Sequence, residues 1–174
     1  MTKLDASQAQ CWVLTYKEGL LSPLAHDLKL AIGGFELDID FTARTVEARF
    51  DASSLRVDCA LHSGQPAPEL LSVYDCQKIE QEIRASVLES DRYPEIRFRS
   101  TQVTDRQVTG LLTLHGCQRT VSFPIQNLGE RHLCEVDLHQ PDFHIRPYRA
   151  FLGTLRIAPI VRVVVSVPTQ SPET

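Results

Sequence analysis

The sequence has few of the features that mark a nucleic-acid-binding, exported or membrane-spanning protein. Its 174 residues carry 18 Lys and Arg against 22 Asp and Glu, a net charge of −4, and no basic cluster, which argues against a nucleic-acid partner. The first ten residues contain no apolar segment of a secretory signal, so we expect a cytoplasmic protein. The longest apolar stretch, residues 157–168, is too short to span a bilayer and is interrupted by Pro159 and Arg162.

Cysteine and histidine are also too few and too scattered to form a recognisable cross-linking or metal-binding pattern. The five cysteines form no CxxC pair: Cys11, Cys59, Cys76, Cys117 and Cys134. In a protein without an export signal, reduced thiols are favoured over a disulfide framework. The histidines at 115, 132, 139 and 144 lie in separate segments with no zinc-site spacing. We therefore expect no metal and no other cofactor.

What the sequence does contain is an alternation of apolar and polar residues that is typical of half-buried strands. About eight segments show it, namely 11–16, 28–41, 44–52, 95–103, 108–114, 118–126, 133–140 and 155–167. Residues 72–88 instead place apolar side chains three or four apart, at Val73, Cys76, Ile79, Ile83 and Val87. This spacing predicts a helix, with Ser72 as its N-cap and Asp75 as the capping-box partner. We expect a single domain, 1–174, that is mostly β: an antiparallel barrel or sandwich with one short helix.

The segment "LKLAIGGFELDIDF", residues 28–41, changes the phase of its alternation at Gly33-Gly34. Apolar residues occupy even positions before the glycines and odd positions after them. A β-bulge at a barrel corner explains this pattern, because the strand bends there and keeps its apolar face inside. Glycine suits a bulge that needs positive φ. The alternative is a hairpin of two short strands, with a tight Gly-Gly turn between them.

Several stretches resemble the YceI-like family: "YPEIRFRS" at 93–100, "VTGLLTLHG" at 108–116 and "TVSFPI" at 120–125. The shorter "GGF" at 33–35 and "SSL" at 53–55 also resemble family residues, and the order of all these segments agrees from about Trp12 to Val167. The resemblance implies an extended, lipocalin-like antiparallel β-barrel that encloses a long apolar ligand, often a polyisoprenoid. It implies no catalytic residues.

Two departures from the family concern polar residues. The chain has Gln140-Pro141-Asp142-Phe143-His144 where many members have an Arg-x-Asp-Phe-Gly pattern, and His26-Asp27-Leu28 stands near the place of a common His-Ser pair. Because both departures are polar, they bear on recognition of a head group more than on binding of an apolar chain. Many relatives are exported, whereas this sequence shows no signal.

The inward strand faces supply the predicted lining of the barrel. Periodicity alone does not separate a barrel filled by its own side chains from one that holds a ligand, and it favours the filled core; the resemblance favours the ligand. The predicted apolar lining residues are Leu30, Ile32, Phe35, Leu37, Ile39, Phe50, Ile96, Phe98, Leu112, Leu114, Val121, Phe123, Ile125, Val136, Leu138 and Val163.

Polar candidates for the mouth of the barrel are His26, Arg146 and Tyr148. His26-Asp27 can be read as a base with its orienting carboxylate, but neighbours on a strand point to opposite faces, so a pair satisfied by backbone is favoured. The segment "RPYRAF", 146–151, either lines the mouth and meets a head group or is a solvated loop with an aromatic plug. Cys117 has no base beside it in the sequence.

Three hypotheses on function follow. The first is a non-catalytic protein that sequesters or carries a polyisoprenoid or another long-chain lipid inside the barrel, with the Pro/Gly-rich loop 62–69 and the helix after it as a gate. The second is an enzyme acting on a lipid-like substrate with His26 as base. The third is a structural or partner-binding barrel without ligand. A homodimer is a separate expectation. It is based on the family resemblance and on Ile160 and Val164, two apolar residues at the even positions of the last strand, which are predicted to face outward.

Overall fold

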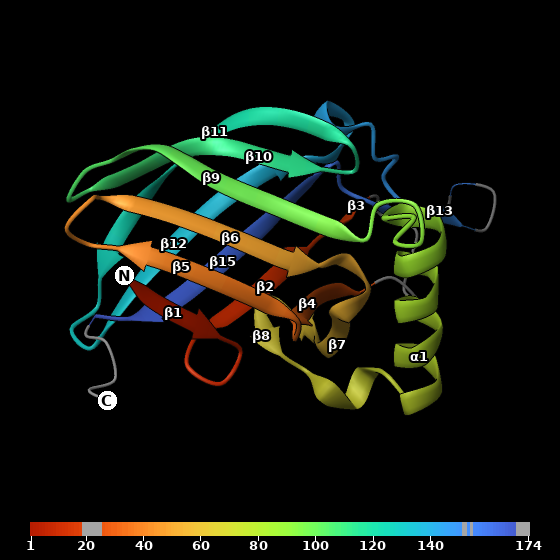
Figure 1. The fold of residues 1–174 in the computed structure, drawn as a ribbon. Coiled ribbons are helices and arrows are strands. Elements are labelled where there is room, and N and C mark those ends of the chain that lie inside the picture. The colour runs from red at the N-terminus through yellow and green to blue at the C-terminus, as the bar shows by residue number, and fades with distance from the viewer. Residues whose placement is uncertain (19–25, 151–152, 154, 170–174) are drawn as a thin grey trace.

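A twelve-stranded antiparallel sheet curls into a barrel-like wall in this computed structural model, and a helix lies across one end of it (Figure 1). The structure describes residues 1–18, 26–150, 153 and 155–169. The strand order in the large sheet is β1-β5-β6-β9-β10-β11-β12-β15-β2-β4-β7-β8, and β13-β14-β3 form a small second sheet. The predicted class is confirmed, whereas the count of about eight strands is too low because bends divide several long strands.

The strand bounds show where the chain bends. They are β1 Thr2–Asp5, β2 Gln10–Thr15, β3 Lys17–Glu18, β4 Asp27–Ile32, β5 Phe35–Asp40, β6 Thr45–Asp51, β7 Leu55–His62, β8 Gln65–Pro66, β9 Glu95–Val103, β10 Gln107–Leu114, β11 Cys117–Asn127, β12 Arg131–His139, β13 Arg149–Ala150, β14 Leu155–Ile157 and β15 Ile160–Pro168. Short 3₁₀ turns span Ala52–Ser54, Pro68–Leu70 and Gln140–Phe143.

The glycine pair at 33–34 forms a corner and not a hairpin turn. β4 pairs with β2 and β7, whereas β5 pairs with β1 and β6, so the two segments do not pair with each other. On the neighbouring segment, β6 and β7 are joined through Ala52–Ser54 in the same way. Ile32 lies opposite Leu55 and Phe35 opposite Phe50, so two long bent strands run side by side through the corner. The residues before and after the glycines therefore share one interior, as the phase change predicted.

The reason for glycine at the corner differs from the predicted one. The φ angle is left-handed at Gly64, Gly116, Gly129 and Gly153, but neither corner glycine is among these residues. Gly34 is needed for space, because a Cβ there would lie 3.1 Å from the Cβ atoms of Asp51 and Ser54. The two bent strands touch at the corner, and a side chain at residue 34 would force Asp51 or Ser54 to shift by a few tenths of an ångström.

The helix forms where the three-to-four spacing predicted it. α1 spans Val73–Glu82 and continues as one π-helical turn, Ile83–Val87. The Asp75 N–H donates to Ser72 Oγ at 3.1 Å, and the Ser72 N–H donates to Asp75 Oδ2 at 3.0 Å, which confirms the capping box. Val73 is exposed, so the apolar stripe begins one turn later than predicted.

The last predicted strand, 155–167, is interrupted. β14 belongs to the small sheet and β15 to the large one, with Ala158 and Pro159 between them. Pro159 has no N–H to donate, and its carbonyl instead accepts from the Gln140 N–H at 2.8 Å. Among the described residues, no helix is long and apolar enough to cross a membrane.

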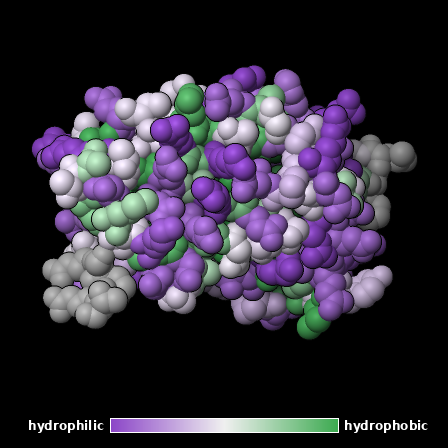
Figure 2. Space-filling view, in the orientation of Figure 1, coloured by the Kyte–Doolittle hydropathy of each residue, from purple (hydrophilic) through white to green (hydrophobic). Residues whose placement is uncertain are grey.

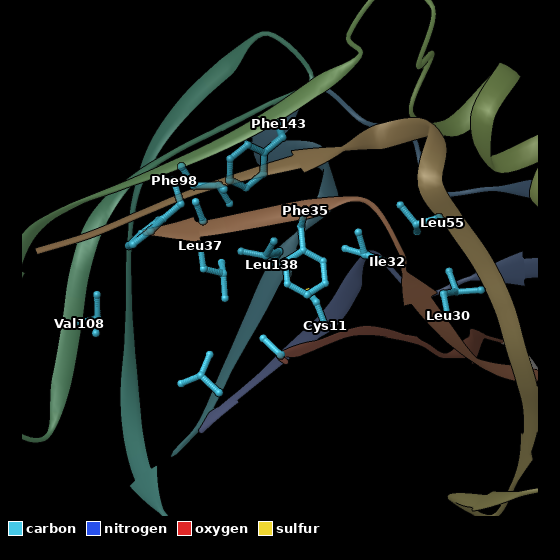
Figure 3. Close-up of a cluster of buried hydrophobic side chains, with 14 of the residues drawn as sticks. Cys11, Leu30, Ile32, Phe35, Leu37, Leu55, Phe98, Val108, Leu138 and Phe143 are labelled. Carbon is cyan, nitrogen blue, oxygen red and sulfur yellow. The ribbon is translucent and has the colours of Figure 1, made fainter. Parts of the chain in front are cut away.

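The core follows the inward strand faces, and the surface is mostly polar. The buried cluster includes Leu4, Leu30, Leu37, Phe98 and Leu138. Figure 3 shows Leu30, Leu37, Phe98 and Leu138 converging from strands on several sides of the wall. On the face seen in Figure 2, hydrophilic residues predominate and hydrophobic ones form small separate areas.

The inward assignment of β5 is tested by a charge at its first residue. Phe35 is buried and packs its ring against Phe50, with the two centroids 5.9 Å apart. We expect Phe35→Asp to lower the free energy of unfolding by about 4 kcal/mol or more, because the carboxylate has no partner there. Glu36→Ala, one residue away on the exposed face, is the control and should change little. Urea titrations of both variants give the measurement, and an unchanged midpoint for Phe35→Asp would contradict the assignment.

A second glycine marks a close approach between two strands. The register of β9 and β10 shifts between Thr109 and Gly110, and a Cβ at Gly110 would lie 2.5 Å from the carbonyl oxygen of Arg99 and from the Phe98 ring. We expect Gly110→Ala to lower the free energy of unfolding by about 1–3 kcal/mol, because the backbone must shift. Gly33→Ala is the control, since the nearest atom to its Cβ lies 3.8 Å away. Equal stability of the two variants in thermal melts would refute this prediction.

Candidate functional site

A long apolar cavity of about 930 Å³ lies inside the curled sheet. Alternate residues of β15 line it from Val161 to Val167, which are six residues apart and so roughly 20 Å apart along the strand. The wall is lined by mostly apolar side chains that come from both halves of the sheet. A volume near 1,000 Å³ is at the upper end of the range for small-molecule sites, roughly 300–1,000 Å³. The barrel is therefore hollow and not filled by its own side chains.

Most of the predicted lining residues lie on the cavity wall. They are Leu30, Ile32, Leu37, Ile39, Phe50, Ile96, Phe98, Leu112, Leu114, Val121, Phe123, Ile125, Val136, Leu138 and Val163. Phe35 does not line the cavity, because its ring packs against Phe50 just after the corner, where the two bent strands approach each other. Whether the lining residues contact a ligand stays a prediction.

Sequence reasoning missed a second part of the wall. The helix contributes Ile79 and Ile83, together with Leu70 and Leu71 from the turn before it. The three-to-four spacing was the signal for the two isoleucines, but it did not show which surface they cover. Cys11, Val13 and Leu28 also line the cavity, and their alternation with polar neighbours was the signal that could have found them.

At one end of the cavity, here called the helix end, α1 faces the segment after the Gln140–Phe143 turn. Glu82 from the helix and Tyr148 from this segment both line the cavity there, and burial together with the charge of Glu82 raises the pKa of Tyr148. Arg146 is exposed and does not line the cavity, whereas its neighbour Ile145 does. Phe151, the aromatic residue of the predicted mouth segment, lies outside the described residues.

His26 lines the helix end, but Asp27 does not accompany it. The Asp27 carboxylate accepts a hydrogen bond from the Lys17 backbone N–H at 2.7 Å, as the backbone-satisfied alternative predicted. No hydrogen bond joins the His26 imidazole to another part of the chain that the structure describes. A base needs an oriented partner, so the His26 hypothesis has no geometric support from the described residues.

The opposite end, here called the turn end, is where the turns 41–44, 104–106 and 128–130 lie. Arg44 and Asp105 line the cavity there and form an ion pair of 3.1 Å between Nη2 and Oδ1. Asp40 lines it too, and hydrogen bonds from the backbone, chiefly from the Ala43 N–H, lower the pKa of its carboxyl group. His132, near the start of β12, is the imidazole on this part of the wall.

One pair of reactive groups lies behind the cavity wall. Cys117 Sγ and His144 Nδ1 are 3.1 Å apart, so an imidazole able to accept the thiol proton stands beside this cysteine. The sequence placed no base beside Cys117, and the structure places His144 there. The two residues are 27 positions apart, and the Gln140–Phe143 turn brings them together by placing His144 in a left-handed conformation at φ 58°. Neither residue lines the cavity.

The protein is thus of the class in which an antiparallel β-sheet curls into a barrel around a long apolar cavity. The chain belongs to the YceI-like family, since the family model for the YceI-like domain matches residues 4–168. A comparison with curated proteins gave no match.

Solved structures of low sequence identity have the same fold. BcnA from Burkholderia cenocepacia is 14% identical, with a TM-score of 0.65 over 96% of this chain and 99% of that chain. A protein described as a polyisoprenoid binding domain from Saccharophagus degradans is 12% identical, with a TM-score of 0.63 over 98% of each chain. The YCEI protein of Campylobacter jejuni is 12% identical, with a TM-score of 0.61 over 91% and 92% of the two chains.

The cysteines should differ in their reactivity toward iodoacetamide. Burial raises the pKa of Cys11 to about 12 and that of Cys134 to about 11, so at pH 8 both stay protonated in the folded protein. We expect Cys117 to be alkylated before either of them, because His144 can take its proton. Peptide mass spectrometry at short times gives the order, and His144→Phe should slow only Cys117. Labelling of Cys11 at the rate seen in urea would contradict this.

Proposed function

We propose that the protein binds a long apolar molecule, a polyisoprenoid or another lipid, inside the barrel and sequesters or carries it without catalysis. The observation that carries the proposal is the elongated cavity of about 930 Å³ with its apolar wall. The Saccharophagus degradans neighbour, which is described as a polyisoprenoid binding domain, supports it. The volume also argues against a barrel without ligand, because protein interiors are normally close-packed with few voids larger than a water molecule.

Burial of the ligand's apolar chain would dominate its affinity for the protein. About twenty methylene-sized groups at about 0.8 kcal/mol each give on the order of 16 kcal/mol before the costs of ordering and association. An apolar wall provides this energy for any chain that fits. The affinity should therefore follow the length of the apolar chain.

Release requires an element that moves, and α1 is the candidate gate. No residue of α1 is fully buried, although Ile79 and Ile83 pack against the core. The helix is attached to β7 by the Val57 N–H, which donates to Glu80 Oε1 at 2.9 Å, and by a weaker contact between Arg56 and Glu80. The loop before the helix contains β8 and the Pro68–Leu70 turn, so the gate would pivot on this segment.

A homodimer is a separate proposal, and only one of the two residues that supported it in the sequence is exposed. Ile160 is exposed on the outer face of β15, but Val164 is already buried within the single chain, opposite Trp12. Light scattering at high concentration tests the proposal, and a monomer there would end it.

Filling the cavity should reduce lipid uptake more than stability. Leu37 lines the cavity, and Leu37→Trp places a larger ring where the chain would lie. We expect a loss of at least about tenfold in affinity for added polyprenol, with a smaller change in melting temperature. Glu36→Trp adds the same ring on the exposed face of β5 and is the matched control. Native mass spectrometry with lipid extraction measures uptake, and repeated absence of any apolar ligand in the wild-type protein would contradict the proposal.

A further inference from the structure

The charges on the cavity wall are unfavourable for an anionic head group. Four carboxylates line the cavity, from Asp40, Asp75, Glu82 and Asp105, against two cationic side chains, from Arg44 and Lys78. Each end of the cavity holds two of these carboxylates and one cation. A phosphate placed at either end would therefore meet a net negative wall, although solvent screens part of the repulsion because Asp75 and Asp105 are exposed.

Both cations are next to carboxylates. Arg44 is paired with Asp105 at the turn end. Lys78 at the helix end lies close enough to Asp75 to lower the pKa of its carboxyl group, after the larger effect of the Ser72 hydrogen bonds. Arg146, the cation expected to meet an anionic head group, is exposed away from the cavity. The described wall thus offers an anion no cation that is free of a neighbouring carboxylate.

The wall also contains an imidazole without an internal partner. His132 lies opposite Val167, at the turn end, while Leu138 on the same strand lies opposite Val161 at the helix end. Within the described ranges, no residue hydrogen-bonds the His132 ring, and its Nδ1 is buried. Because Nδ1 is buried, a ligand in the cavity does not reach it. Nε2 has no partner among the described residues either, and it is the nitrogen left for a head group.

We propose that the cavity selects an apolar chain with an uncharged hydroxyl or carbonyl head group, that His132 hydrogen-bonds this head group, and that the phosphate ester of the same chain is rejected. The inference rests on the proposed function, because it assigns the head group of a ligand held in the same cavity. A neutral imidazole has one donor and one acceptor nitrogen, which suits a hydroxyl or a carbonyl oxygen. The apolar wall then fixes the chain, and His132 fixes its direction.

Three probes with the same carbon skeleton separate the head group from the chain: geranylgeraniol, geranylgeranyl monophosphate and the hydrocarbon phytane. Each displaces the neutral dye N-phenylnaphthylamine from the full-length protein at pH 8. We expect geranylgeraniol to bind about tenfold more tightly than its phosphate, because the phosphate brings its charge to a net negative wall. Phytane should bind with intermediate affinity, since it has neither the hydrogen bond nor the charge.

Variants test the role of His132. His132→Leu should weaken the binding of geranylgeraniol about tenfold and change the binding of phytane by no more than about twofold. His132→Gln should retain most of the affinity for geranylgeraniol, because it keeps a hydrogen-bonding group. Thr15→Val is the matched control: Thr15 also lines the cavity and has an unpartnered buried hydroxyl, but it lies at the helix end, next to Leu14, which pairs with Arg162.

The outcomes are distinct. If phytane and geranylgeraniol both fail to bind, the proposed function itself is wrong. If phytane binds but the phosphate binds as tightly as the alcohol, the selection for a neutral head group is overturned. If Thr15→Val weakens the binding of geranylgeraniol and His132→Leu does not, the assignment of the head group to His132 is overturned. Circular dichroism of each variant confirms that a lost signal does not come from unfolding.

Discussion

The contact between two bent strands at one corner determines much of this structure. β4 runs into β5 at Gly33-Gly34, and β7 is joined to β6 through Ala52–Ser54, with the two bends packed against each other. Because Gly34 has no side chain, Asp51 and Ser54 approach it closely. Each bent strand can then belong to two parts of the sheet while its apolar face stays inside. Without this contact the apolar residues on the two sides of the corner would face different regions.

The hollow interior follows from the size of the side chains that face it. An eight-stranded barrel is just wide enough for its own side chains or one small ligand. Bends divide two of the long strands here, at β4–β5 and β6–β7, and many inward positions carry medium-sized Val, Ile or Leu. These side chains cover the wall but do not reach across it. The open volume is therefore a property of topology and residue size together, and α1 closes one end of it (Figure 1).

The sequence predicted the features that depend on local spacing. Alternation placed the inward residues of β9, β10, β11 and β15, and the Ser72–Asp75 pair predicted the start of α1. It could not predict contacts made between distant segments. The approach of His144 to Cys117, the space required at Gly34 and the partners of the helix all depend on how elements pack, which no period in the chain records. The break at Ala158-Pro159 was also missed, because the alternation continues across it.

The order of the strands also limits self-association through the backbone. The large sheet ends in β1 on one side and β8 on the other, and these strands have four and two residues. Pro66 in β8 cannot donate a hydrogen bond to an added strand, and Lys3 in β1 brings a charge to the other edge. Short, charged or proline-containing edges are how β-proteins avoid edge-to-edge aggregation. Such edges oppose the addition of further strands, which is the step by which β-fibrils grow.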